Sequence, residues 1–137
     1  MAQFASLNYD ASVWEVMVAL TAGATLCLLP PDVPAAGAEL SRWLRDSEIT
    51  TILLPPSVLA TLPDEPLPRL RLLISGGEKC PRWLARQWSA GRRFVNAYGP
   101  TEVTVIVRHA CGGPGERTGA RDRLRLAEPG DRARHPL

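Results

Sequence analysis

Short apolar runs alternate with helical stripes along the first 111 residues of the chain. Runs that are closed by proline or glycine are typical of strands buried on both faces. Stripes with apolar residues three and four positions apart predict amphipathic helices between these strands. The predicted strands cover residues 25–29, 51–54, 70–75, 93–97 and 103–107, and the predicted helices cover residues 13–22, 37–47 and about 81–88.

Local signals set the ends of two of these helices. Ser12 and Glu15 have the spacing of a capping box, which predicts that the first helix starts beside them. Gly23 is expected to end that helix, and Pro81 is suited to the first turn of the last one.

Strands that alternate with helices imply crossover connections and therefore a parallel sheet. We expect an α/β fold, with a doubly wound, mainly parallel sheet of four or five strands and flanking helices. The loops at 55–57, 76–78 and 96–102 then follow the carboxyl ends of strands. Ligands of open α/β sheets bind at this edge.

Composition narrows the class of protein. The 137 residues are 45% hydrophobic and 22% charged, which is typical of one globular domain. No apolar run is long enough to span a membrane, and no export signal precedes residue 25, so we expect a soluble, cytoplasmic chain. Cys27, Cys80 and Cys111 are too few and too widely spaced for a disulfide framework or, with two histidines, a zinc site.

Charge is distributed unevenly along the chain. Residues 1–68 carry two Arg and eight acidic residues, whereas residues 69–137 carry fourteen basic and six acidic ones. A basic half can indicate nucleic-acid binding. Here the arginines are scattered without interleaved aromatic residues, which favours a solvated surface and no nucleic-acid partner. Lys79 is the only lysine, so any step that needs a lysine must use it or one from elsewhere.

The last part of the chain, residues 112–137, has a different composition. It contains six arginines and only six hydrophobic residues, with no helix or strand period. Such a segment buries too little apolar area to offset its ordering entropy, so we expect disorder. The domain is accordingly predicted to cover residues 1–111.

Three motifs carry a resemblance to a known family. They are FASLNYDASVWE at 4–15, LLISGGEKC at 72–80 and NAYGPTE at 96–102. In order and spacing they resemble consecutive core motifs of the amino-acid adenylation domains of nonribosomal peptide synthetases, in the adenylate-forming superfamily. The resemblance covers about residues 2–111. Acyl-CoA and aryl acid ligases of the same superfamily usually lack this Asp10 and this form of the loop.

The resemblance implies that an amino acid carboxylate attacks the α-phosphate of ATP, giving an aminoacyl adenylate and pyrophosphate. Asp10 would pair with the substrate's α-ammonium group, since a charged amine in a dehydrated pocket needs an opposite charge. For an isolated Asp before a helix the commoner role is an N-cap, and only the surrounding motif favours the pocket role.

The loop NAYGPTE would hold the nucleotide. Asn96 would offer an amide to the adenine edge, Tyr98 a ring to stack on it, Thr101 a hydroxyl to phosphate and Glu102 an oxygen to Mg²⁺. The implied ATP or AMP contacts are Gly76, Gly77, Glu78, Asn96, Ala97, Tyr98, Gly99 and Thr101, with Thr101 and Glu102 as catalytic residues and Glu102 as the metal ligand.

The resemblance also implies a substrate pocket, formed by the residues at the positions that line it in the family. Besides Asp10, its wall would consist of Ala11, Trp14, Ser57, Ile74, Gly76, Ala97, Val105 and Ile106. Apart from Ser57 these residues are apolar, which implies a hydrophobic, medium to large amino acid side chain. Each of them taken alone is more often an ordinary core residue.

Several parts of a complete adenylation domain have no match in this sequence. The glycine-rich phosphate loop, the ribose-binding Asp and the subdomain with the catalytic lysine are expected outside it, so the chain is interpreted as an internal fragment without activity of its own. The arginine-rich tail after Arg117 resembles an out-of-frame translation. The intact parent would pass its product to a carrier-protein domain. The alternative is a non-catalytic remnant or a module that binds a nucleotide or a partner.

Overall fold

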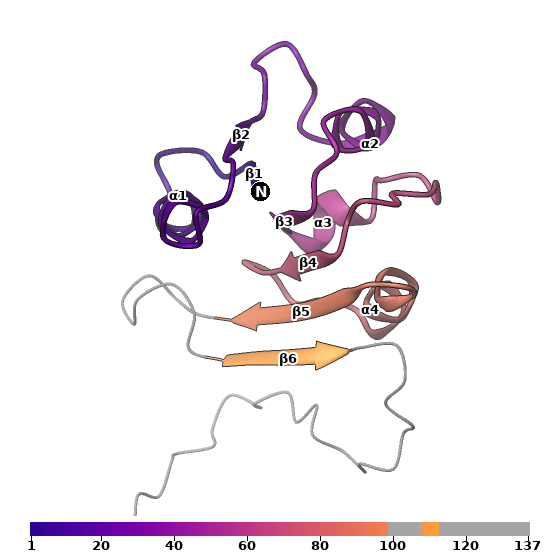
Figure 1. Cartoon of the computed structure of the whole chain (residues 1–137). Coiled ribbons are helices and arrows are strands. Elements are labelled where there is room, and N and C mark those ends of the chain that lie inside the picture. The colour runs from indigo at the N-terminus through magenta and orange to yellow at the C-terminus, as the bar shows by residue number, and fades with distance from the viewer. Residues whose placement is uncertain (99–107, 113–137) are drawn as a thin grey trace, which may run out of the picture.

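The computed structural model describes residues 1–98 and 108–112, which form helices packed against a mainly parallel sheet (Figure 1). The elements in chain order are β1 (Ala2–Gln3), α1 (Asp10–Thr21), β2 (Cys27–Leu28), α2 (Gly37–Asp46), β3 (Thr51–Leu54), α3 (Pro56–Leu59), β4 (Leu72–Ser75), α4 (Arg82–Ser89), β5 (Arg93–Tyr98) and β6 (Arg108–Gly112).

The main sheet has four strands in the order β3-β4-β5-β6. The first three are parallel, and their register places Leu53 beside Ile74 and Ile74 beside Val95. β6 runs antiparallel to β5. The predicted strand at 25–29 is reduced to β2, which pairs with β1 in a separate two-stranded sheet and not with the main sheet. The predicted strand at 103–107 lies outside the described residues, as does the tail at 113–137.

Both faces of β3 and β4 are covered, which explains why these two strands are apolar runs. Ile52, Leu73 and Phe94 face the larger core, which also contains side chains from α2 and α4. On the opposite face, Leu53, Ile74 and Ala97 form a small cluster with Trp14 of α1. Figure 1 shows α1 well apart from α2 and α4, on the side of the molecule toward which β4 and β5 point.

The start of α1 differs from the capping box that the sequence predicts. The N-cap is Tyr9, and Ser12 lies inside the helix, where its Oγ donates to the Tyr9 carbonyl at 2.7 Å. Glu15 is fully buried, and its Oε2 accepts the backbone N–H groups of Phe4 and Ala5, both at 3.1 Å. The prediction was wrong because Glu15 lies on the buried face of α1, where it satisfies backbone donors of the segment that follows β1.

Glu15 is expected to make stability fall as pH rises. Desolvation raises its pKa from 4.5 to about 7, against the opposing effect of hydrogen bonds from Ala5, Phe4 and Gln3. A pKa higher in the folded than in the unfolded state means that the folded chain binds more protons, so this stability is complete below pH 4.5 and is lost by about pH 7. The shift corresponds to about 3 kcal/mol at most.

Urea unfolding of the wild-type chain and of Glu15→Gln across pH 4–8 measures this effect. As pH rises over this range, we expect the unfolding free energy of the wild type to fall relative to that of Glu15→Gln. Parallel pH profiles would contradict the assignment to Glu15.

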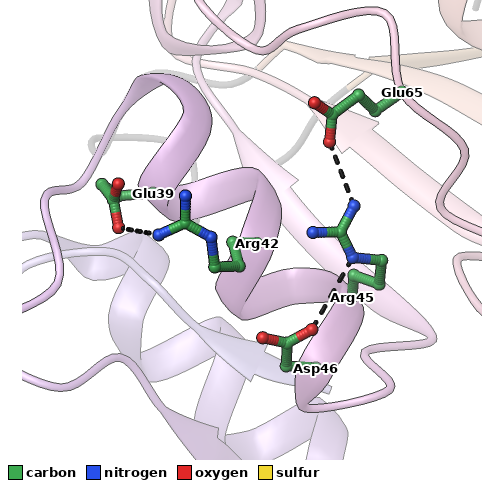
Figure 2. A network of polar contacts seen from close by, with 5 residues as sticks. All are labelled: Glu39, Arg42, Arg45, Asp46 and Glu65. Atoms are coloured by element: carbon green, nitrogen blue, oxygen red, sulfur yellow. Dashed lines mark hydrogen bonds and ion pairs between the residues drawn. The ribbon is translucent and has the colours of Figure 1, made fainter.

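Surface ion pairs contribute little to this fold. On α2, Arg42 pairs with Glu39 at 2.7 Å, and Arg45 contacts Glu65 at 3.0 Å and Asp46 at 3.6 Å (Figure 2). All of these side chains are exposed, and exposed pairs contribute about 0–1 kcal/mol each.

α1 carries exposed as well as buried apolar side chains. Trp14 and Ala19 face the protein, whereas Val13, Met17 and Leu20 are exposed. Across the described part of the chain, no helix is long and apolar enough to cross a membrane.

Candidate functional site

The carboxyl ends of β3, β4 and β5 meet at one edge of the main sheet, as the alternation of elements predicts. Leu54, Ser75 and Asn96 are neighbours in register at this edge. The N–H of Gly76 donates to the Leu54 carbonyl at 3.3 Å, which extends the pairing by one residue. The start of α3 at Pro55 and the loop that begins at Gly76 therefore lie side by side.

One face of this edge carries three of the predicted pocket residues. Ile74 and Ala97 are buried in one cluster, and Trp14 of α1 packs against it. Gly76 lies next to Ala97, where an added Cβ would be 3.3 Å from the Ala97 carbonyl oxygen and 3.6 Å from its Cβ. Any larger residue at 76 would fill the space above Ala97, so glycine keeps this part of the wall open.

The opposite face of the same edge carries Asn96. Its neighbours in the sheet are Ser75 of β4 and Ala110 of β6. Among the described residues, the Asn96 Oδ1 atom is buried and has no hydrogen-bond partner. Buried acceptors are usually satisfied, so this atom can take a hydrogen bond from a donor that reaches the edge.

Asp10 is the first residue of α1 and is half-buried. The alternative role as an N-cap is wrong, because Tyr9 holds that position and no side chain caps the helix there. Asp10 and Trp14 are four residues apart in one helix, so they share a face. Ala11, next to Asp10, is also half-buried.

Ser57, in the first turn of α3, and Glu78, in the loop after β4, are hydrogen-bonded to each other. The Glu78 Oε2 atom accepts the Ser57 backbone N–H at 3.1 Å, and its Oε1 atom accepts the Ser57 hydroxyl at 2.8 Å. Gly77, just before Glu78, has a φ of 82°, a conformation that favours glycine. The sequence gives no local signal for this link, since its residues are 21 positions apart.

The remaining predicted site residues are not placed by the structure. Tyr98 is described only as the last residue of β5. Gly99, Thr101, Glu102, Val105 and Ile106 lie outside the described residues, so their implied contacts with phosphate, Mg²⁺ and substrate stay predictions. Within the described ranges, no three His, Cys, Asp or Glu residues form a group that could hold a metal ion.

Comparison with known proteins identifies similar sequences and structures. Residues 1–130 match the family model described as AMP-binding enzyme. Over 103 residues, the chain is 52% identical to a probable non-canonical nonribosomal peptide synthetase, CymA, of Salinispora arenicola. This match covers 75% of the chain and 1% of that synthetase, so the chain spans a very small part of this relative.

Two solved structures show the same fold. The adenylation domain AlmE of Vibrio cholerae, in complex with glycyl-adenosine-5'-phosphate, superposes with a TM-score of 0.69 at 31% identity, covering 80% of this chain and 22% of that one. The AMPPNP-bound form of the nonribosomal peptide synthetase FmoA3 gives 0.70 at 28% identity, covering 80% and 13%. The predicted α/β fold, as a slice of an adenylation domain, is confirmed.

Proposed function

The chain belongs to the AMP-binding enzyme family, as its motifs predict, and we propose that it forms the substrate-binding part of an amino-acid-activating domain. The reaction joins an amino acid and ATP to give an aminoacyl adenylate and pyrophosphate. A carboxylate oxygen attacks the α-phosphorus, and the bond from that phosphorus to pyrophosphate breaks. The parent protein would be a cytoplasmic nonribosomal peptide synthetase that passes the product to a carrier-protein domain.

The observation that carries this proposal is the two-sided edge at the end of β5. Asn96 and Ala97 are consecutive strand residues, so their side chains point to opposite faces of the sheet. Ala97 belongs to the apolar cluster with Trp14, whereas Asn96 carries the orphaned acceptor. Two different ligands can thus approach one edge from opposite sides and meet where the strands end.

On the apolar side, the amino acid would be held by charge at one end and by packing at the other. Asp10 pairs with the α-ammonium group, and Trp14, Ile74 and Ala97 surround the side chain. Gly76 leaves room beside Ala97. A hydrophobic, medium to large side chain fits this wall best, because no described wall residue offers a charge to balance a charged one.

On the other side, ATP would bind as the second substrate. The Asn96 Oδ1 atom is an acceptor suited to the 6-amino group of adenine. Tyr98 follows it at the end of β5, where its ring can stack on the base. Thr101 and Glu102 stay the proposed contacts to phosphate and Mg²⁺.

Two alternatives differ in their ligands. An acyl-CoA or aryl acid ligase takes a substrate without an α-ammonium group, so the half-buried Asp10 would have no cation of the substrate to pair with. A non-catalytic module would bind nucleotide or a partner without turnover. Asp10 favours an amino acid over the first alternative, and the experiment below separates catalysis from the second.

A polypeptide of these 137 residues alone is expected to form no detectable adenylate with any amino acid. Its only lysine, Lys79, is exposed and follows Gly-Gly-Glu, unlike either lysine that the family uses. Loss of one group that stabilises developing charge typically lowers the rate about 10²–10³-fold. Amino-acid-dependent exchange of pyrophosphate into ATP measures this.

The matched experiment joins the chain in frame to the segments that the family places before and after it. Exchange should then appear and should be lost in Asp10→Ala. Exchange by the 137 residues alone, lost in Asp10→Ala, would overturn the first expectation. A joined protein that folds but exchanges with no amino acid would contradict the proposed function.

A further inference from the structure

Glu78 makes two hydrogen bonds to one residue of the proposed pocket wall. Both carboxylate oxygens are engaged by Ser57, one by its backbone N–H and one by its hydroxyl. The two residues follow different strands, β3 and β4, so the bond pair ties the start of α3 to the loop after β4 at the carboxyl edge (Figure 1).

The start of α3, which carries Ser57, needs a hydrogen-bond acceptor from elsewhere in the chain. Pro56 is the first residue of α3 and has no N–H, and Pro55, the N-cap, has no side chain that could accept a hydrogen bond. The N–H of Ser57 is therefore the first donor of the helix, and its acceptor comes from Glu78 in the loop after β4. The two prolines restrict the backbone before Ser57, so this segment has few conformations. The contact with Glu78 holds it in one of them.

The direction of the hydroxyl hydrogen has a chemical consequence. A serine hydroxyl has one hydrogen and two lone pairs. A carboxylate can only accept, so the hydrogen of Ser57 points to Glu78. The Ser57 oxygen is left as an acceptor with no hydrogen to donate to a ligand.

We propose that Glu78 is a positioning residue that makes Ser57 an acceptor-only group in the substrate pocket. The inference rests on the proposed function and refines its substrate class. The pocket should prefer an apolar side chain that carries one hydroxyl or N–H donor over the same side chain without it. Side chains that end in a carboxylate are disfavoured, since they bring neither a donor nor a charge compatible with Glu78.

This preference has a general physical basis. A site that is built to hydrogen-bond a substrate hydroxyl rejects the analogue without it, because a polar group of the site is left unpaired. Ser57 and Glu78 are exposed in the chain, so part of this effect is lost to water. We expect a preference of about tenfold, toward the low end of such effects.

Ligand preference and amide exchange in the 137-residue chain test the proposal. Saturation-transfer NMR compares L-tyrosine with L-phenylalanine and L-threonine with L-valine, two pairs that differ by a donor group. Hydrogen exchange of the Ser57 amide reports the bond to Glu78. Both are measured in the wild type, Glu78→Ala, Glu78→Gln and Ser57→Ala, with Glu65→Gln as the control, because Glu65 is a similarly exposed carboxylate paired with Arg45.

The expected results differ between variants. Glu78→Ala should speed exchange of the Ser57 amide about tenfold and remove the preference for the donor ligand. Ser57→Ala should remove the preference as well, and Glu65→Gln should behave as the wild type. Glu78→Gln is the decisive variant, since its amide can accept the Ser57 N–H and donate to the hydroxyl oxygen. The amide then stays protected while the preference is lost.

Two outcomes would overturn the proposal. One is a donor preference that persists in Glu78→Ala, and the other is unchanged exchange of the Ser57 amide in that variant. Failure of the proposed function looks different, because none of the four amino acids would then bind while the Ser57 amide would still lose protection in Glu78→Ala.

Discussion

Replacing Asp10 with alanine is expected to abolish detectable binding of α-amino acids. Asp10 begins α1 on the same face as Trp14, which packs against Ile74 and Ala97. An ammonium group enclosed there without a counter-charge would be left unpaired, at a cost of about 3–5 kcal/mol, or a loss of affinity of at least about 100-fold. NMR titration of the chain, and kcat/KM for exchange in the joined protein, measure this loss.

The control for Asp10 is Asp46→Ala. Asp46 is an exposed carboxylate near the end of a helix and contacts only Arg45 at 3.6 Å among the ion pairs of the described residues. Its removal should leave amino acid binding unchanged. Equal losses in the two variants would point to a general effect of net charge and would refute a specific ammonium contact.

Replacing Leu73 with alanine is expected to cost a large share of the folding free energy. Leu73 is 0% exposed in β4, between Ile52 and Phe94 of the neighbouring strands, in the larger core. Truncation of a buried leucine typically costs about 2–5 kcal/mol, against a total of about 5–15 kcal/mol for a folded domain. Urea unfolding followed by circular dichroism measures the change.

The matched control is Leu20→Ala in α1. Leu20 is 63% exposed, so its truncation creates no cavity, and we expect a change within about 0.5 kcal/mol. A Leu73→Ala variant as stable as Leu20→Ala would mean that β4 is not the centre of the core.

Three strands of the main sheet, β3, β4 and β5, could be predicted from the sequence because they contribute to the clusters on both faces of the sheet. β3 was predicted with its observed ends, and β4 and β5 within two residues of theirs. Their order in the chain and the helices between them also identify the carboxyl edge as the ligand edge. These features follow from apolar patterns within short segments of the sequence, and the same segments are strands in the packed structure.

Elements that depend on distant partners could not be predicted in the same way. β1 has two residues, and β6, with the sequence RHACG, has no apolar run, so both are recognised only by their pairing. The capping box failed because Glu15 binds the backbone of another segment. Sequence spacing alone contains neither of these contacts.

The candidate site also has features that could be predicted from the sequence and features that could not. Trp14, Ile74 and Ala97 were predicted by motif, and the fold brings them together from three different elements. The link from Ser57 to Glu78 was not predicted, because it depends on how α3 and the loop after β4 meet in space. A motif indicates which residues gather at the edge, whereas their hydrogen bonds depend on the packed structure.

The central claim is that adenine and amino acid approach the end of β5 from opposite faces, through Asn96 and Asp10. NMR titration of the 137-residue chain with AMP and with a non-hydrolysable aminoacyl sulfamoyl adenosine tests it most directly. The proposed half-site should bind AMP with a dissociation constant on the order of millimolar. Asn96→Ala should weaken both ligands, and Asp10→Ala only the aminoacyl compound. Equal weakening of AMP by Asp10→Ala, or unchanged AMP binding in Asn96→Ala, would contradict the account.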